Sequence, residues 1–415
     1  MSKTKSSTRH PLLNTSAGDP ALFRGLTENR VSRRRFLQAG ALAAGCLGMG
    51  PFAFAAESTD WEDWWKKQKP SGELVFANWP YYIDVDAHSG KHPSLEKFTA
   101  QTGISIKYRE VIQNNASFYA RIAPVLKAGQ ATGYDIIVLT STWQLTELMM
   151  QNWLIPLWKE KIPNFYKNAS QSVISPSFDK GNRYTVTWQS GFTGIGYNPK
   201  LTGRKIDSIE DLWDPDFAGH VGMMSDNTEL GSVALLKLGI DPVTSTPDDW
   251  EKAAAVLREQ KQKGLVRQYY DNSYINALEN GDIWISQAWS GDIFQSRAKG
   301  FGDLEFVVPK EGAMLWHDNM MIPVGAPNPL SALSWMNFYY TPEIAGMVED
   351  YVNYVCPVPA ARDYIAGVLK DPDVANSPLV FPTSDMYSKA HDFYTFKTYA
   401  EYQRWNSNFN PVIQG

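Results

Sequence analysis

Apolar residues along the chain after position 71 form short runs that alternate with amphipathic segments. Three of these runs have the length and residue types of strands, and YDIIVLT is continuously apolar from Ile136 to Leu139, as expected for a strand buried on both faces. The three runs are residues 72–79, 104–111 and 134–140. The segments between them with helical spacing of apolar residues are 94–103 and 117–130. Because strands and helices alternate, the pattern predicts a parallel sheet covered by helices.

The same alternation returns in the middle of the chain. Further strands are predicted at residues 193–198, 220–225 and 282–289. Residues 208–215 are expected to form a short helix capped by Ser208, and Thr246 opens a longer helix that ends at Gly264. A proline and two aspartates follow Thr246, and both residue types suit the first turn of a helix. The pattern therefore predicts a second α/β lobe.

Two segments, WQSGFTGIG (188–196) and LWHDNMMIP (315–323), stand where the chain would cross between the lobes. A cleft between the lobes would have both crossings at its base. Asp318 lies two positions after Trp316 in a stretch that otherwise resembles protein core. If the segment is extended, these two side chains share one face and His317 points the other way. Asp318 is thus either an ordinary loop or cap residue, or a carboxylate that faces the cleft.

Composition adds that the body of the chain is aromatic and acidic. The 15 tryptophans and 20 tyrosines form either a bulky core or a cleft lined by rings. Residues 1–46 carry a charge of +6, which leaves −11 for the rest of a chain whose net charge is −5. An acidic body argues against nucleic-acid binding, which needs a basic face, and permits a cationic ligand. The two cysteines exclude a disulfide framework and a cysteine-rich metal site, and no apolar run in the body is long enough to span a membrane.

The first 46 residues have the pattern of an export signal. SRRRFLQ (32–38) precedes a run of small and apolar residues, and its arginine pair resembles a twin-arginine signal. Cys46 follows Ala-Ala-Gly as in a lipobox, which would make it the lipidated first residue of the mature protein. Ala53-Phe54-Ala55 is an alternative site for ordinary cleavage. We therefore expect a periplasmic or cell-surface protein, either free or lipid-anchored to the cytoplasmic membrane.

Eight segments of the body together resemble one protein family. They are FANWPYYI (76–83), YDIIVLTS (134–141), TGIGYNPKL (193–201), SIEDLWDPDFAGHV (208–221), MMSDNTELGSVALLKLG (223–239), ISQAWSGD (285–292), VVPKEGAMLWHDNMMIP (307–323) and YVCPVPAAR (354–362). Their order and spacing, over residues 72–365, resemble the periplasmic solute-binding proteins of ABC importers, in particular the spermidine/putrescine-binding branch. The resemblance implies a type II periplasmic-binding-protein fold with two α/β lobes. It also implies a monomer without enzymatic activity that delivers its ligand to permease subunits in the membrane.

The family binds polyamines in the cleft, with aromatic faces along the methylene chain and carboxylates on the ammonium groups, and needs no cofactor or metal. The residues that match its motifs are Trp79, Tyr82, Asp226, Glu229, Trp289, Trp316, Asp318 and Tyr354. Where the family often has Pro-Ser after the second buried strand, this chain has Thr140 and Thr142, which would supply hydroxyl groups instead. Such a site is physically sensible, because buried ammonium groups need carboxylates or π faces close by.

Each of these residues also has an ordinary structural interpretation. Asp226 and Glu229 fit a helix cap and its first-turn acid, and the tryptophans fit a core. Asp271, in YYDNSY, is an additional candidate for the site. The predicted domains are residues 1–46 (signal with lipobox), 47–71 (extension), 72–190 (first lobe), 191–318 (second lobe) and 319–415 (a return segment that completes the first lobe, with C-terminal helices).

Other functions remain open at this point. The ligand could be another small amine or an opine-like solute. A ferric-ion site could use Tyr269-Tyr270, whereas Tyr339-Tyr340 falls in a predicted helix and is expected to be core. An enzyme is disfavoured, because the six histidines form no recognised ligand spacing and the chain has neither a G-x-S-x-G elbow nor a P-loop.

Overall fold

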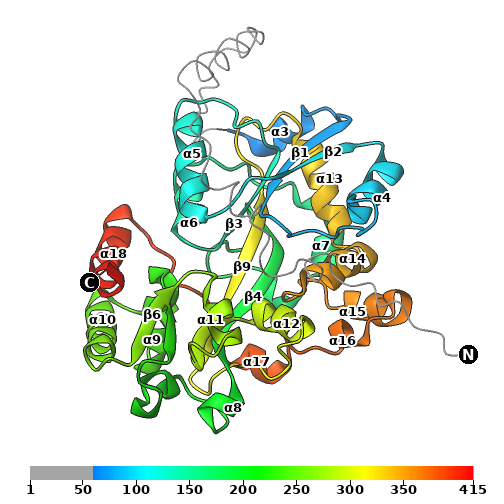
Figure 1. Ribbon diagram of the computed structural model, residues 1–415. Helices are drawn as coiled ribbons and strands as arrows, with labels where there is room; N and C mark the ends of the chain where they lie inside the picture. Colours follow the sequence, from blue (N-terminus) through cyan, green and yellow to red (C-terminus); the bar gives the residue numbers. More distant parts are fainter. Residues whose placement is uncertain (1–58, 415) are drawn as a thin grey trace, which may run out of the picture.

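The computed structural model describes residues 59–414, which form one 10-stranded sheet with helices packed around it (Figure 1). The strands follow the order β2-β1-β3-β9-β4-β7-β5-β6, with β10 beside β9 and β8 beside β4. Their bounds are β1 (Glu73–Asn78), β2 (Ser105–Glu110), β3 (Ile136–Thr140), β4 (Val186–Tyr197), β5 (Val221–Met224), β6 (Val266–Tyr270), β7 (Ile285–Trp289), β8 (Glu305–Val307), β9 (Ala313–Met321) and β10 (Ala390–His391). Buried apolar residues gather mainly in two clusters, and we call the elements around them lobe 1 and lobe 2.

Helices cover both lobes. The α-helices are α3 (Trp61–Lys66), α4 (Pro93–Thr102), α5 (Asn115–Lys127), α6 (Trp143–Met150), α7 (Pro163–Asn168), α8 (Pro199–Thr202), α9 (Asn227–Lys237), α10 (Pro247–Gln262), α11 (Tyr274–Glu279), α12 (Ser290–Ala298), α13 (Pro329–Tyr339), α14 (Pro342–Val352), α15 (Ala361–Tyr364), α16 (Pro372–Ala375), α17 (Ser384–Ser388) and α18 (Tyr399–Gln414). Shorter helical turns are η3 (Lys159–Lys161), η4 (Gln171–Val173), η5 (Ile209–Trp213), η6 (Pro215–Phe217), η7 (Pro242–Thr244) and η8 (Ile365–Leu369).

Lobe 1 contains the parallel sheet that the sequence predicts. β1 pairs in parallel with β2 on one side and with β3 on the other, and α4 and α5 provide the crossovers. Gly103 ends α4 with a φ of 74°, a left-handed conformation that a residue without a Cβ adopts at low cost. The predicted order of strand, helix, strand, helix and strand is confirmed.

Lobe 2 repeats the arrangement, with β5 parallel to both β6 and β7. α10 begins as expected, because Thr246 and Asp249 form a reciprocal capping box. Residues 208–215, predicted as a short helix, instead contain the 3₁₀ turn η5, followed at Pro215 by the start of η6. Ser208 does cap that turn, with Asp211 as its partner.

β4 and β9 connect the lobes as two adjacent antiparallel strands (Figure 1). They pair from Val186 opposite Met320 to Thr193 opposite Met314. Val186 and Met320 belong to the core of lobe 1, whereas Met314 belongs to the core of lobe 2. The first segment predicted to cross between the lobes therefore lies within β4, and the second lies in β9 up to Met321. The domain boundaries placed at 190/191 and 318/319 fall inside these strands and remain a prediction.

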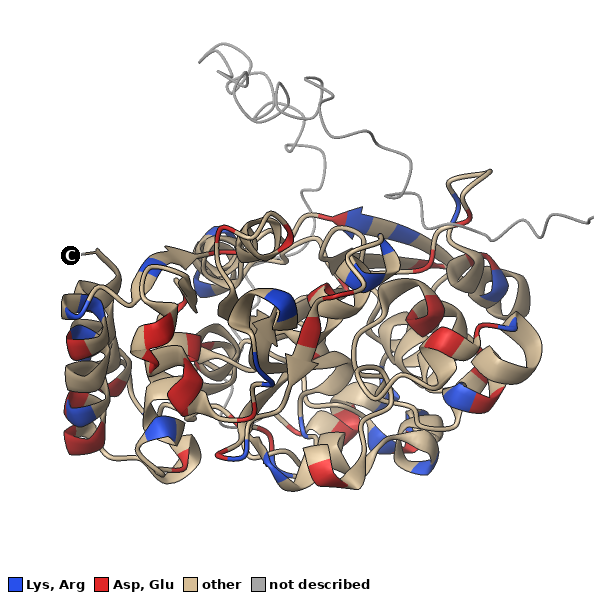
Figure 2. Cartoon of the chain, turned by 60° about the horizontal axis from the view of Figure 1, so that its bottom comes forward, with Lys and Arg blue, Asp and Glu red and all other residues tan. Residues whose placement is uncertain are grey.

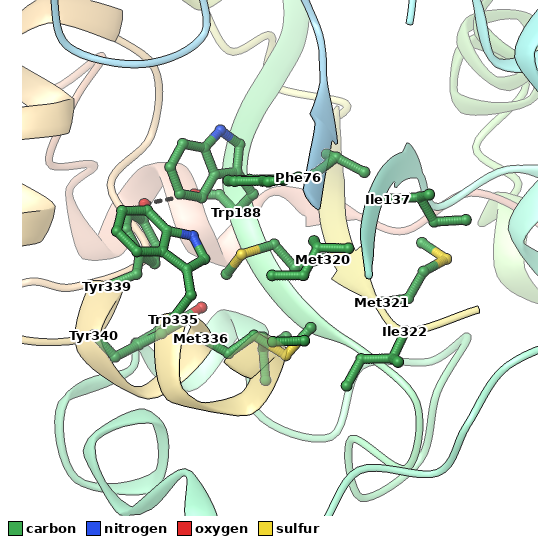
Figure 3. Close-up of a cluster of buried hydrophobic side chains, with 14 of the residues drawn as sticks. Phe76, Ile137, Trp188, Met320, Met321, Ile322, Trp335, Met336, Tyr339 and Tyr340 are labelled. Atoms are coloured by element: carbon green, nitrogen blue, oxygen red, sulfur yellow. Dashed lines mark hydrogen bonds between the residues drawn. The ribbon is translucent and has the colours of Figure 1, made fainter. Parts of the chain in front are cut away.

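The core of lobe 1 includes side chains from the crossing strands (Figure 3). Trp188 of β4 packs against the ring of Tyr339, with 4.4 Å between ring centroids. The Tyr339 hydroxyl donates a hydrogen bond to the carbonyl oxygen of Trp188 at 2.5 Å, and the Tyr340 hydroxyl donates to that of Thr187 at 2.6 Å. Both tyrosines are fully buried, which confirms that this pair is core.

The short helix α3 packs on lobe 1. Trp65 is 3% exposed, and its indole nitrogen donates to the carbonyl oxygen of Pro156 at 2.9 Å.

The export signal, Cys46 and the alternative cleavage site at Ala55 lie outside the described residues. Within residues 59–414 no helix combines the length and apolarity needed to cross a membrane. Acidic and basic residues are interspersed along these elements (Figure 2).

Candidate ligand-binding cleft

A cavity of about 620 Å³ lies between the two lobes. Its volume is in the range of small-molecule sites. The lining includes all ten residues predicted for the site, namely Trp79, Tyr82, Thr140, Thr142, Asp226, Glu229, Trp289, Trp316, Asp318 and Tyr354. The additional candidate Asp271 lines it too. The structure thus brings together residues that are up to 275 positions apart in the sequence, from Trp79 to Tyr354. Their roles toward a ligand remain predictions.

Asp318 lies on the crossing strand β9 with 7% of its surface exposed. Its Oδ2 accepts a hydrogen bond from the Tyr82 hydroxyl at 2.7 Å, and its Oδ1 accepts one from the Thr140 hydroxyl at 2.6 Å. Burial raises the pKa of Asp318, although both hydrogen bonds oppose that rise. The carboxylate is oriented by lobe 1 without a lysine or arginine partner among the described ion pairs.

The neighbours of Asp318 alternate as an extended strand requires. Trp316 faces the cavity and packs edge-on against Tyr354, with ring centroids 5.3 Å apart. His317 points away from the cavity, and its Nδ1 lies 2.7 Å from the Ser190 hydroxyl. The Trp316 ring lies against Gly191 of β4. A larger residue would not fit there, because a Cβ at position 191 would fall 2.1 Å from Cζ2 of Trp316. The predicted split between Trp316 and Asp318 on one face and His317 on the other is confirmed.

Asp226 and Glu229 stand at the start of α9 in lobe 2. Asp226 caps the helix, since its Oδ1 accepts from the backbone N–H groups of Thr228 and Glu229 at 2.8 and 3.1 Å. The structural interpretation of Asp226 is therefore correct, yet the same side chain also lines the cavity. Capping through Oδ1 fixes the position of the carboxyl group.

Glu229 is 6% exposed, and it accepts hydrogen bonds only through Oε1. The donors are the Thr193 hydroxyl at 2.8 Å and the Trp289 indole nitrogen at 3.1 Å. Its Oε2 is buried without a partner among the described residues. Burial and the nearby Asp226 carboxylate raise the pKa of Glu229 to about 8. A buried carboxyl oxygen without a hydrogen-bond partner is stabilised either by binding a proton or by contact with a cationic ligand.

Asp292, in the first turn of α12, is a cavity residue that the sequence prediction missed. Its two oxygens accept hydrogen bonds from the Tyr274 and Tyr354 hydroxyls, both at 2.8 Å. Burial raises the pKa of Asp292, and these hydrogen bonds oppose the rise. Asp292 is the last residue of the segment ISQAWSGD. The sequence feature that could have identified it as a site residue is its position three residues after Trp289. It can equally be taken for an ordinary first-turn acid.

Aromatic rings separate the carboxyl groups. Tyr354 packs edge-on against both Tyr82 and Trp316, with the Tyr82 centroid 6.0 Å away. Trp289 lines the cavity on the lobe 2 side, where its indole nitrogen donates a hydrogen bond to Glu229. The indole nitrogens of Trp79 and Trp316 are buried without a hydrogen-bond partner among the described residues. Rings in these positions can cover an apolar chain and present π faces to cations.

The two threonines differ in what they do. Thr140 links Asp318 to Asn115, whose side-chain amide donates to the Thr140 hydroxyl at 2.9 Å. Thr142 immediately precedes α6, and its hydroxyl donates to the Gln144 side chain at 3.0 Å. Hydrogen bonds from the Ser273 side chain and from its backbone N–H, the latter at 2.9 Å, hold the pKa of the Asp271 carboxyl below the ordinary value.

The lining therefore holds five carboxyl groups, of Asp226, Glu229, Asp271, Asp292 and Asp318, and no lysine, arginine or histidine among the described residues. The pKa of four of them, Asp226, Glu229, Asp292 and Asp318, is raised, and desolvation is the largest cause in each case. A ligand with positive charge would relieve this desolvation, and aromatic rings between the carboxyls would contact apolar parts of it. Across residues 59–414, no group of three or more His, Cys, Asp and Glu side chains is arranged to hold a metal ion.

Comparison with known proteins gives consistent results. A family model described as bacterial extracellular solute-binding protein matches residues 94–382. The spermidine/putrescine-binding periplasmic protein of Salmonella typhimurium is 31% identical over 349 residues, which cover 84% of this chain and 90% of the relative. A putrescine-binding periplasmic protein of Pseudomonas aeruginosa is 30% identical over 334 residues. This match covers 76% of this chain and 85% of the relative.

A solved structure shows the same architecture. It is a spermidine/putrescine transporter substrate-binding protein of Streptococcus pneumoniae, with a TM-score of 0.70 and 24% identity. The match covers 82% of this chain and 98% of that one, so the two-lobed periplasmic-binding-protein fold is shared. The family match and the relative from Salmonella each span most of the chain. This chain belongs to the bacterial extracellular solute-binding protein family.

Proposed function

We propose that this chain is the solute-binding component of an ABC importer and that it binds a polyamine such as putrescine or spermidine in the cleft. The observation that carries the proposal is a set of carboxyl groups in a cavity whose described lining contains no lysine, arginine or histidine. The names of the curated relatives from Salmonella and Pseudomonas support the same ligand class. These relatives are named as binding proteins, which favours transport over catalysis.

The placement of the carboxyl groups favours a ligand with several ammonium groups. Asp318 belongs to a crossing strand and is held by lobe 1, whereas Glu229 stands at the start of α9 in lobe 2. Asp292 provides a third carboxyl group. Tyr354 lies between it and Tyr82, because its hydroxyl donates to Asp292 and its ring packs against that of Tyr82. A linear amine can reach separated carboxylates while its methylene groups lie against the rings. A single compact ammonium ion could satisfy only one of these positions.

The alternatives fit the cavity less well. An opine or amino-acid-like ligand carries a carboxylate, and the described lining offers no lysine, arginine or histidine to receive it. A ferric site at Tyr269-Tyr270 would need both phenolates, but of this pair only Tyr270 lines the cavity. The Tyr269 hydroxyl is buried outside it, and burial raises the pKa of Tyr269 to about 12, which disfavours the phenolate.

The finer points of the proposal concern export and assembly. The sequence of the leader supports the twin-arginine route, with either lipidation of Cys46 or cleavage after Ala55. Delivery would then occur outside the cytoplasm to permease subunits, by a monomer whose lobes close on the ligand. Mass spectrometry of the mature N-terminus separates the two processing routes.

Titration calorimetry with putrescine and spermidine tests the ligand class. We expect one-to-one binding to the mature chain and a loss of about 10- to 150-fold in affinity for Asp318→Asn, since a hydrogen bond to a charged group contributes about 1.5–3 kcal/mol. Asp216→Asn is the matched control, because Asp216 is exposed and does not line the cavity. Absence of binding by every polyamine tried would reject the ligand class, and unchanged affinity in Asp318→Asn would reject the role of Asp318.

A further inference from the structure

The helix α18 packs against the start of α9, where two of the cleft carboxyls lie: that of the N-cap Asp226 and that of Glu229. It packs so closely on α9 that a Cβ at Gly231 would fall 2.3 Å from Cζ2 of Trp405 and 2.9 Å from the ring of Phe409. Trp405 and Phe409 are both fully buried in the core of lobe 2. Figure 1 shows α18 beside α10 at the edge of that lobe.

Polar contacts from α18 fix the residue that follows Asp226. The Asn227 side-chain amide donates to Oδ1 of Asn406 at 2.5 Å and to Oδ1 of Asn410 at 2.7 Å. The indole nitrogen of Trp405 donates to the carbonyl oxygen of Asn227 at 3.1 Å. The position of the lobe 2 wall therefore depends on α18 as well as on α9 itself.

Lobe 1 reaches the same helix through Trp143. This residue opens α6 directly after Thr142, which lines the cleft. The other core residues of α6, Leu145 and Leu148, pack in lobe 1, but Trp143 is 4% exposed and packs in the core of lobe 2. Its ring stacks on Tyr402 of α18, with centroids 4.9 Å apart and planes inclined by 10°.

We propose that the stack of Trp143 on Tyr402 is a contact between the lobes that limits how far the cleft opens. The lobes are connected covalently by the crossing strands β4 and β9 and by the segment between Val380 of the lobe 1 core and Phe393 of the lobe 2 core. A rotation of one lobe against the other would move α6 relative to α18 unless the stack holds them together. Each lobe supplies one wall of the cavity, so a wider opening lowers the population able to contact a ligand on both sides. For its ligand measurement this inference rests on the proposed function.

The test combines a double-mutant cycle with a measurement that needs no ligand. The variants are Trp143→Ala, Tyr402→Ala and the double variant. The control is the stack of Tyr119 on Trp153, whose centroids lie 6.5 Å apart and which is contained in lobe 1. Small-angle X-ray scattering on the ligand-free mature protein reports opening, and calorimetry with putrescine reports affinity, both well below the unfolding temperature.

Each single variant of the stack is expected to increase the radius of gyration and to weaken putrescine binding about 2- to 12-fold, the range for one aromatic pair. The loss of affinity in the double variant should be smaller than the sum of the two single losses, because the stack is common to both, while Trp143 also contacts Phe396 and Tyr399. Trp143→Phe should restore part of the affinity. Alanine at Tyr119 and Trp153 should lower the unfolding temperature without changing either readout.

Two results would overturn the inference: an unchanged radius of gyration in the stack variants, or losses of affinity that simply add. A purely structural role of Trp143 predicts the second result, since it would affect folding without coupling to Tyr402 in binding. If the wild type binds no polyamine, the proposed function fails, while the scattering comparison still decides whether the stack restrains opening.

Discussion

Glu229 offers a quantitative test, because its protonation should be coupled to ligand binding. In the ligand-free cleft, burial and Asp226 raise the pKa of Glu229 to about 8, so at pH 7 about nine in ten molecules carry the proton. An ammonium group beside Oε2 favours the ionised form and displaces that proton. Ionising Glu229 at pH 7 costs about 1.4 kcal/mol, which corresponds to about tenfold in affinity.

Putrescine affinity is therefore expected to rise about 25-fold between pH 6.5 and 8.5 from this group, while the amines remain charged. At pH 7 binding should release about 0.9 proton from Glu229, which calorimetry measures as the dependence of the enthalpy on buffer ionisation enthalpy. In Glu229→Gln this share of the release and of the pH dependence should disappear. Glu160→Gln, at an exposed glutamate outside the cavity, is the matched control.

Stability of the ligand-free protein should change in the corresponding direction. The pKa of Glu229 is higher in the folded protein than its ordinary value of 4.5, so the folded state binds the proton more tightly. Its contribution to the free energy of unfolding is full below about pH 4.5 and is lost as the pH rises through about 8. Thermal unfolding of Glu229→Gln should therefore be less sensitive to alkaline pH. Equal proton release by wild type and Glu229→Gln would refute the assignment.

Other predictions follow from individual contacts. Asp292→Asn should weaken polyamine binding about 10-fold or more, and Tyr354→Phe should weaken it less, as measured by calorimetry; unchanged affinity in Asp292→Asn would exclude a ligand contact there. Gly191→Ala should displace the Trp316 ring, because the new Cβ would stand 2.1 Å from it, so both ligand affinity and unfolding temperature should fall. A crystal structure with an unmoved ring would contradict this. Thr246→Ala should lower the free energy of unfolding by about 1 kcal/mol without affecting binding, and chemical denaturation is the measurement.

Much of the fold could be predicted from the sequence because its elements have strong local patterns. The continuous apolar run of β3 and the cap signals of α10 are local properties, and both elements form as expected. The turn η5 shows the limit of such signals. Ser208 does start a helical turn, but Pro215 interrupts the segment and opens η6, so no regular α-helix forms there.

The residues of the site could be predicted largely through the resemblance, whereas their partners could not. Nothing local to Asp318 indicates that Tyr82, 236 positions earlier, donates to it, because the contact exists only once both lobes are folded. Asp292 was missed for the same reason: its two tyrosine partners come from α11 and from the segment after α14. Local signals identify helix ends well, but they do not say which first-turn acids face a cleft.

The central claim is that the buried carboxyls of the cleft receive the ammonium groups of a polyamine. A crystal structure of the mature chain with spermidine tests it most directly. We predict density for the ligand between the lobes, with ammonium nitrogens within about 3 Å of Asp318 and of Asp226 or Glu229, and with methylene groups against the tryptophan rings. Spermidine bound away from these carboxyls, or a cleft that stays empty at saturating spermidine, would contradict the claim.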